Sequence, residues 1–223
     1  LRKISTFSNM LERSLKDKLD AQARNYLDKI NNSASRMNVL IRDVLTYSEL
    51  VKANEVFVAV DLNTILENIL SDYDLLIEQK QAVIDCGRLP VIEAIPLQMT
   101  QLFANLLGNA LKFTRKDVRP VIRIWSEQLT PERTRSNPLL NESVTYVSIM
   151  VKDNGIGFAE EYAEQIFNIF QRLHRKSEFE GTGIGLAMCK KIALNHHGDI
   201  NACGSSGDGA VFNVLLPLRQ MPA

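Results

Sequence analysis

The sequence is poor in cysteine and has no excess of charge of either sign. Its three cysteines, Cys86, Cys189 and Cys203, are an odd number without the spacing of a metal site, which favours a reduced, cytoplasmic setting. Lysine and arginine together number 26, as do aspartate and glutamate, so the formal net charge is zero. This balance argues against bulk electrostatic binding to nucleic acid or to an acidic membrane surface.

Long uncharged apolar runs, a signal peptide and an initial methionine are also missing. No run approaches the length of a membrane span, so we expect none in this segment. Because Leu1 already belongs to an amphipathic pattern, we expect the chain to be a segment of a longer protein. Apolar residues make up 45% of the 223 residues, which is enough for a sizeable core.

Residues 1–50 have the apolar periodicity of two helices. The second helix has Asp20 as its expected N-cap and carries a heptad seam, formed by Leu27, Ile30, Ala34, Met37, Ile41 and Val44. A shorter stripe precedes it, formed by Ile4, Phe7, Leu11 and Leu15. The pattern predicts a helical hairpin, and two helices cannot enclose a core of their own. Pairing of two hairpins into a four-helix dimer would bury both stripes, and packing of the hairpin on its own chain is the alternative.

Residues 51–223 mix strands and helices without strict alternation. Strands are predicted at 57–60, 82–85, 91–94, 121–128, 146–151, 199–203 and 210–216. Helices are predicted at 61–77, 96–110, 160–170 and 184–195, and 130–143 is predicted as a surface excursion. The fold class is therefore α+β, with a helical hairpin followed by an α/β sandwich whose mixed sheet has helices on one face.

An acidic residue ends the predicted central strand. Asp153 follows the apolar run 146–151, and Gly155 and Gly157 come directly after it. A carboxylate there can accept a hydrogen bond from an amino group, and glycines let a flat ligand lie close to the main chain. The alternative is a plain turn, because Asp-Asn-Gly strings commonly form turns.

The helix before this strand carries a polar line. Asn105, Asn109 and Lys112 are spaced by four and three residues, so they share one helical face beside an apolar stripe. An amide oxygen there can serve as a hard ligand for Mg²⁺, and the lysine can face phosphate oxygens. A polar rim on an amphipathic helix is the alternative.

Three glycines open the helix at 184–195. The string Gly181-Thr182-Gly183-Ile184-Gly185-Leu186 would present backbone N–H groups to an anion, and the helix dipole favours phosphate there. A flexible cap is the alternative. The sequence has no P-loop, and the string that starts at Gly155 lacks the third glycine of a dinucleotide fingerprint.

Taken in order, these three motifs resemble the ATP-binding catalytic domain of two-component sensor histidine kinases. The N box corresponds to 105–114, the first glycine box to 153–158, the phenylalanine box to 167–170 and the second glycine box to 181–186. With the hairpin, which is similar to the HisKA type, the resemblance covers almost the whole chain. It implies a dimerisation and phosphotransfer hairpin over 1–50 and a GHKL catalytic domain with the Bergerat-type ATP-binding fold over 51–223.

The resemblance also implies residue roles at the adenine end of an ATP site. Asp153 would accept the adenine amino group and select ATP over GTP, whose six-position is a carbonyl. Gly155 and Gly157 would let adenine approach, and Phe113 and Ile156 would be pocket walls.

At the phosphate end, Asn109 would hold Mg²⁺, with Asn105 and Lys112 near the phosphates. The segment 171–181 would be a mobile ATP lid, and Arg172 is either a γ-phosphate contact or a solvated loop residue. The remaining phosphate-site residues belong to the second glycine box, namely Gly181, Thr182, Gly183, Gly185 and Leu186.

The related ATP-hydrolysing clamps place a water-activating glutamate four residues before the metal-binding asparagine. Asn105 occupies that position here, and an amide cannot act as a base, so transfer to a positioned acceptor is favoured over hydrolysis. A hydrolysing clamp and a nucleotide-binding dimer scaffold without catalysis remain the alternatives.

The histidine acceptor that the family requires is missing from the hairpin. His174 lies in the predicted lid, and His196 and His197 are expected to be cations that cap a helix C-terminus. The resemblance therefore places the acceptor before Leu1, so this chain would be unable to phosphorylate itself. It also implies a homodimer through 1–50 and a response-regulator receiver domain as partner, with Lys3 and Thr6 as candidate contacts.

Overall fold

We describe the protein from a computed structural model, which describes residues 1–15, 19–50, 56–173, 179 and 181–220. Part of the predicted hairpin turn, and His174 with most of the predicted lid, lie outside the described residues. The chain forms two compact units, 1–49 and 50–223.

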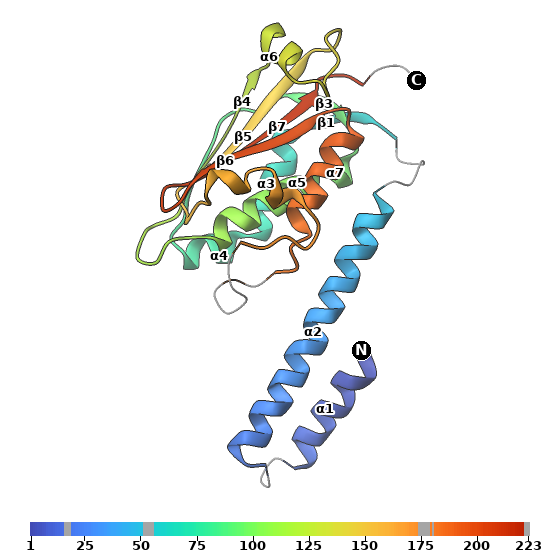
Figure 1. The fold of residues 1–223 in the computed structure, drawn as a ribbon, viewed down its shortest axis with the longest axis vertical. Helices are drawn as coiled ribbons and strands as arrows, with labels where there is room; N and C mark the ends of the chain where they lie inside the picture. The colour runs from blue at the N-terminus through green and yellow to red at the C-terminus, as the bar shows by residue number, and fades with distance from the viewer. Residues whose placement is uncertain (16–18, 51–55, 174–178, 180, 221–223) are drawn as a thin grey trace. The chain divides into compact units, whose positions relative to one another are not determined.

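The first unit is an antiparallel pair of helices, α1 (Arg2–Ser14) and α2 (Ala21–Glu49) (Figure 1). The predicted cap of α2 is confirmed, because Asp20 Oδ1 accepts a hydrogen bond of 2.6 Å from the Ala23 N–H. The two small side chains of Ser8 and Ala34 are buried, and Asn31 Nδ2 donates to Asn9 Oδ1 of the other helix at 3.1 Å. The side chains that the hairpin buries are therefore small, and one polar pair joins its two helices.

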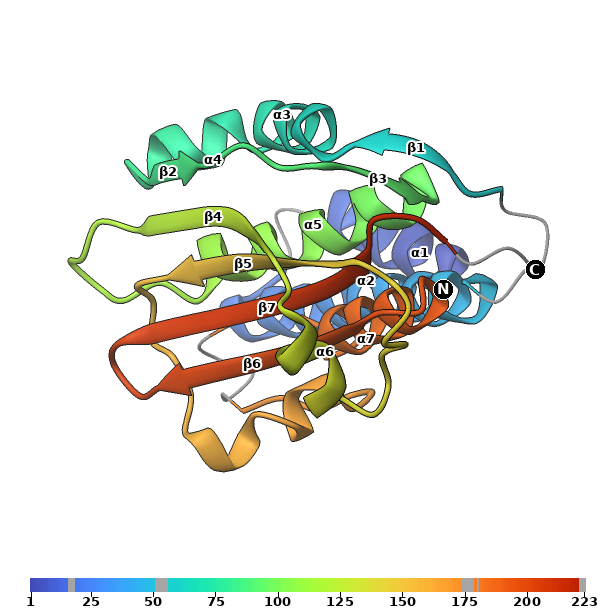
Figure 2. The same ribbon diagram turned by 90° about the horizontal axis from the view of Figure 1, so that it is seen from above.

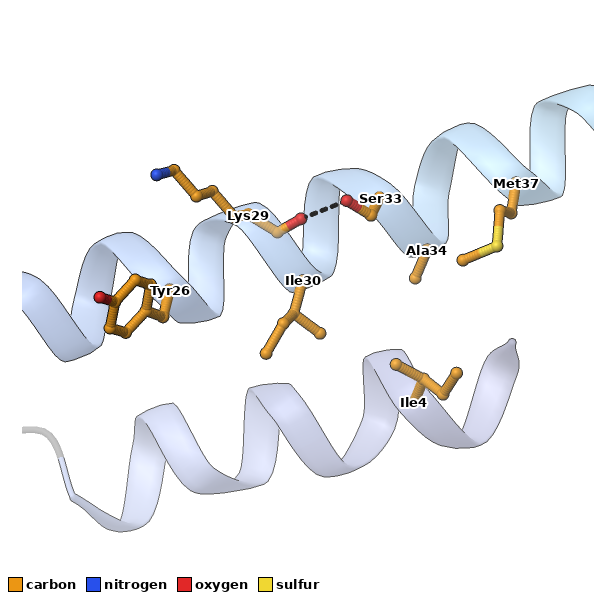
Figure 3. Close-up of a pocket in the computed structure, with 7 residues that line it drawn as sticks. All are labelled: Ile4, Tyr26, Lys29, Ile30, Ser33, Ala34 and Met37. Atoms are coloured by element: carbon orange, nitrogen blue, oxygen red, sulfur yellow. Dashed lines mark hydrogen bonds between the residues drawn. The ribbon is translucent and has the colours of Figure 1, made fainter.

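Most of the predicted apolar seam of the hairpin remains exposed. Ile4 of α1 and Tyr26, Ile30 and Met37 of α2 are between 43% and 54% exposed. Figure 3 shows these side chains around a groove of about 530 Å³, which Ala34 also lines. The hairpin thus has an apolar face that its own two helices do not cover.

The second unit is built on a mixed five-stranded sheet. Its strands, in spatial order, are β2 (Val83–Cys86), β4 (Val121–Gln128), β5 (Tyr146–Asp153), β7 (Gly209–Pro217) and β6 (Asp199–Ser205). Strand β2 is parallel to β4, and the other neighbours are antiparallel. A separate antiparallel pair joins β1 (Val58–Asp61) to β3 (Val91–Ala94). The seven predicted strands are confirmed, with ends that differ by at most two residues.

Helices cover one face of this sheet (Figures 1 and 2). They are α3 (Leu62–Asp72), α4 (Asp74–Gln79), α5 (Pro96–Lys112) and α7 (Gly185–Asn195). Along β5, Val147, Ile149 and Val151 are buried at alternate positions, as expected for the strand face that points into the core. The predicted fold class, a helical N-terminal region followed by an α/β domain with a mixed sheet, is confirmed.

Two predicted helices are interrupted. The helix expected at 61–77 is divided at Tyr73, whose φ of −101° and ψ of 5° lie outside helical geometry. The segment 160–170 forms two 3₁₀ turns, η1 (Glu160–Tyr162) and η2 (Gln165–Phe167). A continuous helix cannot form there, because Asn168 is extended and Phe170 has a positive φ of 66°.

The excursion at 130–143 is more ordered than the sequence indicates. It contains a short helix, α6 (Pro131–Ser136), capped by the Thr130 hydroxyl, which accepts from the Arg133 N–H at 3.4 Å. Downstream, Leu140 packs in a buried cluster with Leu129, Tyr146 and Leu215. The excursion therefore covers apolar side chains of β5 and β7, which its own composition does not reveal.

His196 contacts the last turn of α7, as expected, but the positive charge expected for it is wrong. Its side chain is fully buried, Nε2 accepts a hydrogen bond of 3.0 Å from the Ile95 N–H, and Nδ1 lies 2.8 Å from the Ile192 carbonyl oxygen. An acceptor nitrogen carries no proton, so the ring is neutral and is not a capping cation. It joins the end of α7 to Ile95, the N-cap of α5.

Candidate functional site

The acid of the first glycine box lies at the end of the central strand. Asp153 is the last residue of β5 and is only 8% exposed. Its Oδ1 accepts a hydrogen bond of 2.8 Å from the Gly155 N–H. Burial raises the pKa of this carboxyl above its usual value, while backbone N–H groups of Gly155 and Ala210 oppose the shift. A buried carboxylate with so few protein donors is suited to accept a hydrogen bond from a ligand.

The glycines after Asp153 are required by the surrounding backbone. A Cβ added to Gly155 would lie 2.2 Å from the carbonyl oxygen of Phe113, and the Ile156 N–H donates to the same oxygen at 3.0 Å. Gly157 has a φ of +61°, and a Cβ there would lie 1.9 Å from the Ser205 carbonyl oxygen. The space that these glycines leave is therefore occupied by other backbone segments, which the sequence alone did not indicate.

The polar line of α5 lies along the start of α7 and the second glycine box. Asn105 donates weakly to the Met188 sulfur at 3.7 Å, and its Oδ1 lies 3.2 Å from the position of a Cβ on Gly185. At the other end, Lys112 Nζ lies 4.2 Å from the ring centre of Phe113 and 2.8 Å from the position of a Cβ on Gly181. Asn109 lies between them, so the N box adjoins the second glycine box.

The second glycine box has the backbone of a tight loop. Gly181 and Gly183 have positive φ values of 146° and 76°, and the Phe170 N–H donates to the Gly183 carbonyl oxygen at 2.9 Å. Thr182 lies between these glycines, and Gly185 begins α7, with Leu186 in its first turn. Because the first N–H groups of a helix have no partner within it, the loop leads into a potential anion site.

Arg172 contacts this loop through its guanidinium group. Nη1 donates to the Gly181 carbonyl oxygen at 3.0 Å, and Nη2 donates to the Phe179 carbonyl oxygen at 2.7 Å. The Phe179 ring lies 5.0 Å from that of Phe113, which was predicted as a pocket wall. Phe179 had no motif to indicate it, and only the tertiary contact places it at the site.

The predicted residues thus form two adjoining groups. One contains Asp153, its glycines, Ile156 and Phe113, and the other contains the line of α5 with the second glycine box. Lys112 and Phe113 are neighbours in the chain and join the groups. Among the described residues, no three acidic, histidine or cysteine side chains gather in a metal-binding cluster. A metal ion at this site would therefore depend on amide oxygens and on oxygens of a ligand.

Comparisons with known proteins identify both units. Residues 94–220 match the family described as histidine kinase-, DNA gyrase B-, and HSP90-like ATPase, and residues 1–51 match the His Kinase A (phospho-acceptor) domain. The chain is 33% identical over 218 residues to the phytochrome-like protein Cph1 of Synechocystis sp. and 35% identical to cyanobacterial phytochrome A of Nostoc sp.. These matches cover 98% of this chain but only 27% and 26% of the relatives.

Solved structures share the fold. Full-length ShkA in complex with AMPPNP matches with a TM-score of 0.66 and 23% identity, over all of this chain and 47% of that one. Histidine kinase ThkA in complex with response regulator protein TrrA matches with a TM-score of 0.65 and 22% identity, over 97% of this chain and 58% of that one.

Together, the fold and the two family matches define a phospho-acceptor type hairpin joined to a domain of the histidine kinase and HSP90-like ATPase class. The chain belongs to the sensor histidine kinases. Within the described residues, no helix is long and apolar enough to span a membrane.

Proposed function

We propose that this chain is a kinase core that binds Mg-ATP and transfers the γ-phosphoryl group to a histidine of a dimerisation helix. The phosphoryl group is then relayed to an aspartate of a response-regulator receiver domain. The observation that carries the proposal is the buried carboxylate of Asp153, which accepts from Gly155 within the first glycine box, and that box is bonded through Ile156 to Phe113 at the end of α5. The ShkA complex with AMPPNP, an ATP analogue, supports the choice of nucleotide.

The adenine end of the site would select the base. The carboxylate of Asp153 accepts hydrogen bonds and donates none while it is ionised, so it suits the six-amino group of adenine. Guanine presents a carbonyl at that position, and two acceptors facing each other in a buried site leave both without a partner. Phe113 and Ile156 would flank the base.

The phosphate end would neutralise charge. Asn109, with Asn105 nearby, would hold Mg²⁺ together with phosphate oxygens, and the ion would offset the negative charge of the phosphates. Lys112 and the N–H groups around Thr182, Gly183 and Leu186 would contact the phosphates. Arg172 would contact the γ-phosphate. Its guanidinium has five N–H donors, and two of them donate to the carbonyl oxygens of Gly181 and Phe179, so further N–H groups can face a ligand.

We propose transfer rather than hydrolysis because Asn105 offers no base. An amide cannot remove a proton from water, so catalysis would rest on alignment of the acceptor and on charge neutralisation.

We also propose a cytoplasmic location, because the three cysteines of the chain are free. Fractionation of cells that make the whole protein would test this location.

We expect the purified chain to bind ATP in a Mg²⁺-dependent manner and to bind GTP at least about tenfold more weakly, the cost of one unmet hydrogen bond in a buried site. Incubated with γ-labelled ATP, it should take up no acid-labile phosphate, because residues 1–50 contain no histidine. Calorimetric titration and filter assays measure the two quantities. Equal affinity for GTP would contradict the adenine assignment, and acid-labile label on this chain would contradict the position of the acceptor.

We also propose that a second copy of the hairpin covers the groove of Figure 3, giving a homodimer through a four-helix bundle. The match of residues 1–51 to the phospho-acceptor domain supports a dimer formed by the hairpin. Lys3 and Thr6, both exposed on α1, are proposed contacts of the receiver domain, and a Lys3→Glu variant with weakened receiver binding would support this.

Substitution of a residue in the groove tests the dimer. Ile30→Glu places a charge in the apolar face, and we expect it to convert the dimer to monomers in light-scattering measurements at micromolar concentration. Asn32→Glu adds the same charge on an exposed position two residues away, which lies on a different side of the helix, and should leave the dimer intact. A dimer that persists in Ile30→Glu would rule out this interface.

A further inference from the structure

Three segments that are distant in sequence meet at the adenine end of the site. They are the residues directly after α5 (113–115), the first glycine box (153–158) and the turn between β6 and β7 (205–209). The Gly207 N–H donates to the Ile156 carbonyl oxygen at 2.7 Å, and the Ile156 N–H donates to Phe113. The glycine box is therefore held by backbone bonds on both sides.

The contact with the β6–β7 turn is unusually close. A Cβ added to Gly209 would lie 2.0 Å from the carbonyl oxygen of Asp153, and one added to Gly157 would lie 1.9 Å from that of Ser205. The turn thus packs directly on the backbone of the residue that carries the buried carboxylate. Any shift of this turn would also shift the strand end.

One side chain bridges all three segments. Arg115 Nε donates to the Asn154 carbonyl oxygen at 2.9 Å, and its Nη1 donates to the Gly207 carbonyl oxygen at 2.9 Å. Asn154 is fixed on its other side as well, because its Oδ1 accepts from the Val121 N–H at 2.9 Å and its Nδ2 donates to the Arg119 carbonyl oxygen at 3.0 Å. The peptide that follows Asp153 is therefore anchored at both its backbone and its side chain.

We propose that Arg115 is a positioning residue for the nucleotide, which clamps the β6–β7 turn onto the first glycine box and so fixes the carboxylate of Asp153 for the base. The inference rests on the proposed ATP site, and it adds a residue that belongs to none of the four sequence boxes. Hydrogen bonds from a charged donor are stronger than those between neutral groups. A guanidinium can satisfy two carbonyls in a fixed geometry, whereas a lysine ammonium is a point charge.

Three variants of the full chain test the clamp. Arg115→Ala removes both bonds, and Arg115→Lys keeps the charge but loses the planar fork. Arg123→Ala is the matched control, because Arg123 forms an exposed ion pair with Asp85 at 2.9 Å, and both side chains are more than half exposed. The first measurement is amide hydrogen exchange of Gly207 without nucleotide, and the second is calorimetric titration with Mg-ADP and with Mg-ATP.

We expect Arg115→Ala to accelerate Gly207 exchange and, because it removes two charged hydrogen bonds, to weaken ADP and ATP binding by the same factor, at least roughly tenfold. An equal factor is expected because the defect lies at the base and not at the phosphates. Arg115→Lys should not restore affinity, and Arg123→Ala should match the wild type in both measurements.

The clamp is overturned if Arg115→Ala leaves Gly207 exchange unchanged, or if it only lowers the melting temperature while the folded variant binds both nucleotides normally. Full recovery in Arg115→Lys would also overturn it, because charge alone would then suffice. A wild-type chain that binds neither nucleotide would instead refute the proposed function, and the exchange measurement would still decide whether Arg115 holds the turn.

Discussion

Gly157→Ala is expected to lower the free energy of unfolding by about 3 kcal/mol or more, the sum of a left-handed backbone cost and an overpacking cost. Gly157 has a φ of +61°, and an added Cβ would lie 1.9 Å from the Ser205 carbonyl oxygen and 2.6 Å from that of Gly209. Both neighbours are backbone atoms of the β6–β7 turn, so no rotation of a side chain can relieve the contact. The turn or the glycine box must move instead.

Gly207→Ala separates the two costs. Gly207 also has a positive φ, of +84°, but nothing lies within 4 Å of an added Cβ. This variant should therefore lose only the backbone part, about 1–2 kcal/mol. Urea unfolding of both variants and the wild type measures the difference. Equal losses in the two variants would show that the close packing at Gly157 does not exist in solution.

Asp153→Asn is expected to stabilise the fold at neutral pH while it weakens ATP binding. Burial raises the pKa of the Asp153 carboxyl in the folded protein above its unfolded value, near 3.9. The folded state therefore holds the proton more tightly than the unfolded chain does, so ionisation above the folded pKa costs stability. An asparagine is never ionised and avoids that cost, and its side-chain oxygen can still accept from the Gly155 N–H.

The pH dependence of this gain follows from the direction of the shift. The advantage of Asp153→Asn is complete above the folded pKa and decreases as the pH falls through it, because the wild-type carboxyl then takes up a proton. Below the unfolded pKa both side chains are neutral and the two proteins should have similar stability. Thermal unfolding between about pH 3 and pH 8 measures this, around the reference value for aspartate. A variant that is less stable than the wild type at pH 8 would show that hydrogen bonds outweigh desolvation at Asp153.

The parts of the fold that the sequence predicted have local signatures. The apolar runs of the strands, Asp20 as a helix cap and Pro96 at the start of α5 all depend on neighbours in the chain. The motifs of the site were visible for the same reason, since each is a short run of neighbouring residues in one helix, one strand end or one loop. Their mutual approach was an expectation from the family resemblance.

The features that were missed depend on residues distant in sequence. Arg115 bonds to Gly207, which is 92 residues away, and His196 bonds to Ile95, which is 101 residues away. Neither has a periodic signal, because a single long-range hydrogen bond leaves no pattern in the chain. The break at Tyr73 is likewise a change of two backbone angles inside an otherwise regular apolar pattern.

For the glycines of the first box, the sequence predicted a close approach but not the group that makes it. Their spacing indicated a backbone that something approaches closely, and Gly155 and Gly157 do have such close approaches. What approaches them is the backbone at Phe113 and Ser205. Their proposed contribution to adenine binding is therefore to let three segments pack around Asp153, and the ligand contact is left to the carboxylate.

Titration of the wild type and of Asp153→Asn with Mg-ATP tests the central claim most directly. The substitution preserves the size of the side chain and replaces a charged acceptor, so binding should fall by roughly 10- to 100-fold, the value of one hydrogen bond to a charged group. The thermal unfolding described above shows in the same samples that the variant is folded. Wild-type binding that Asp153→Asn retains in full would contradict the assignment of Asp153 as the residue that recognises the base.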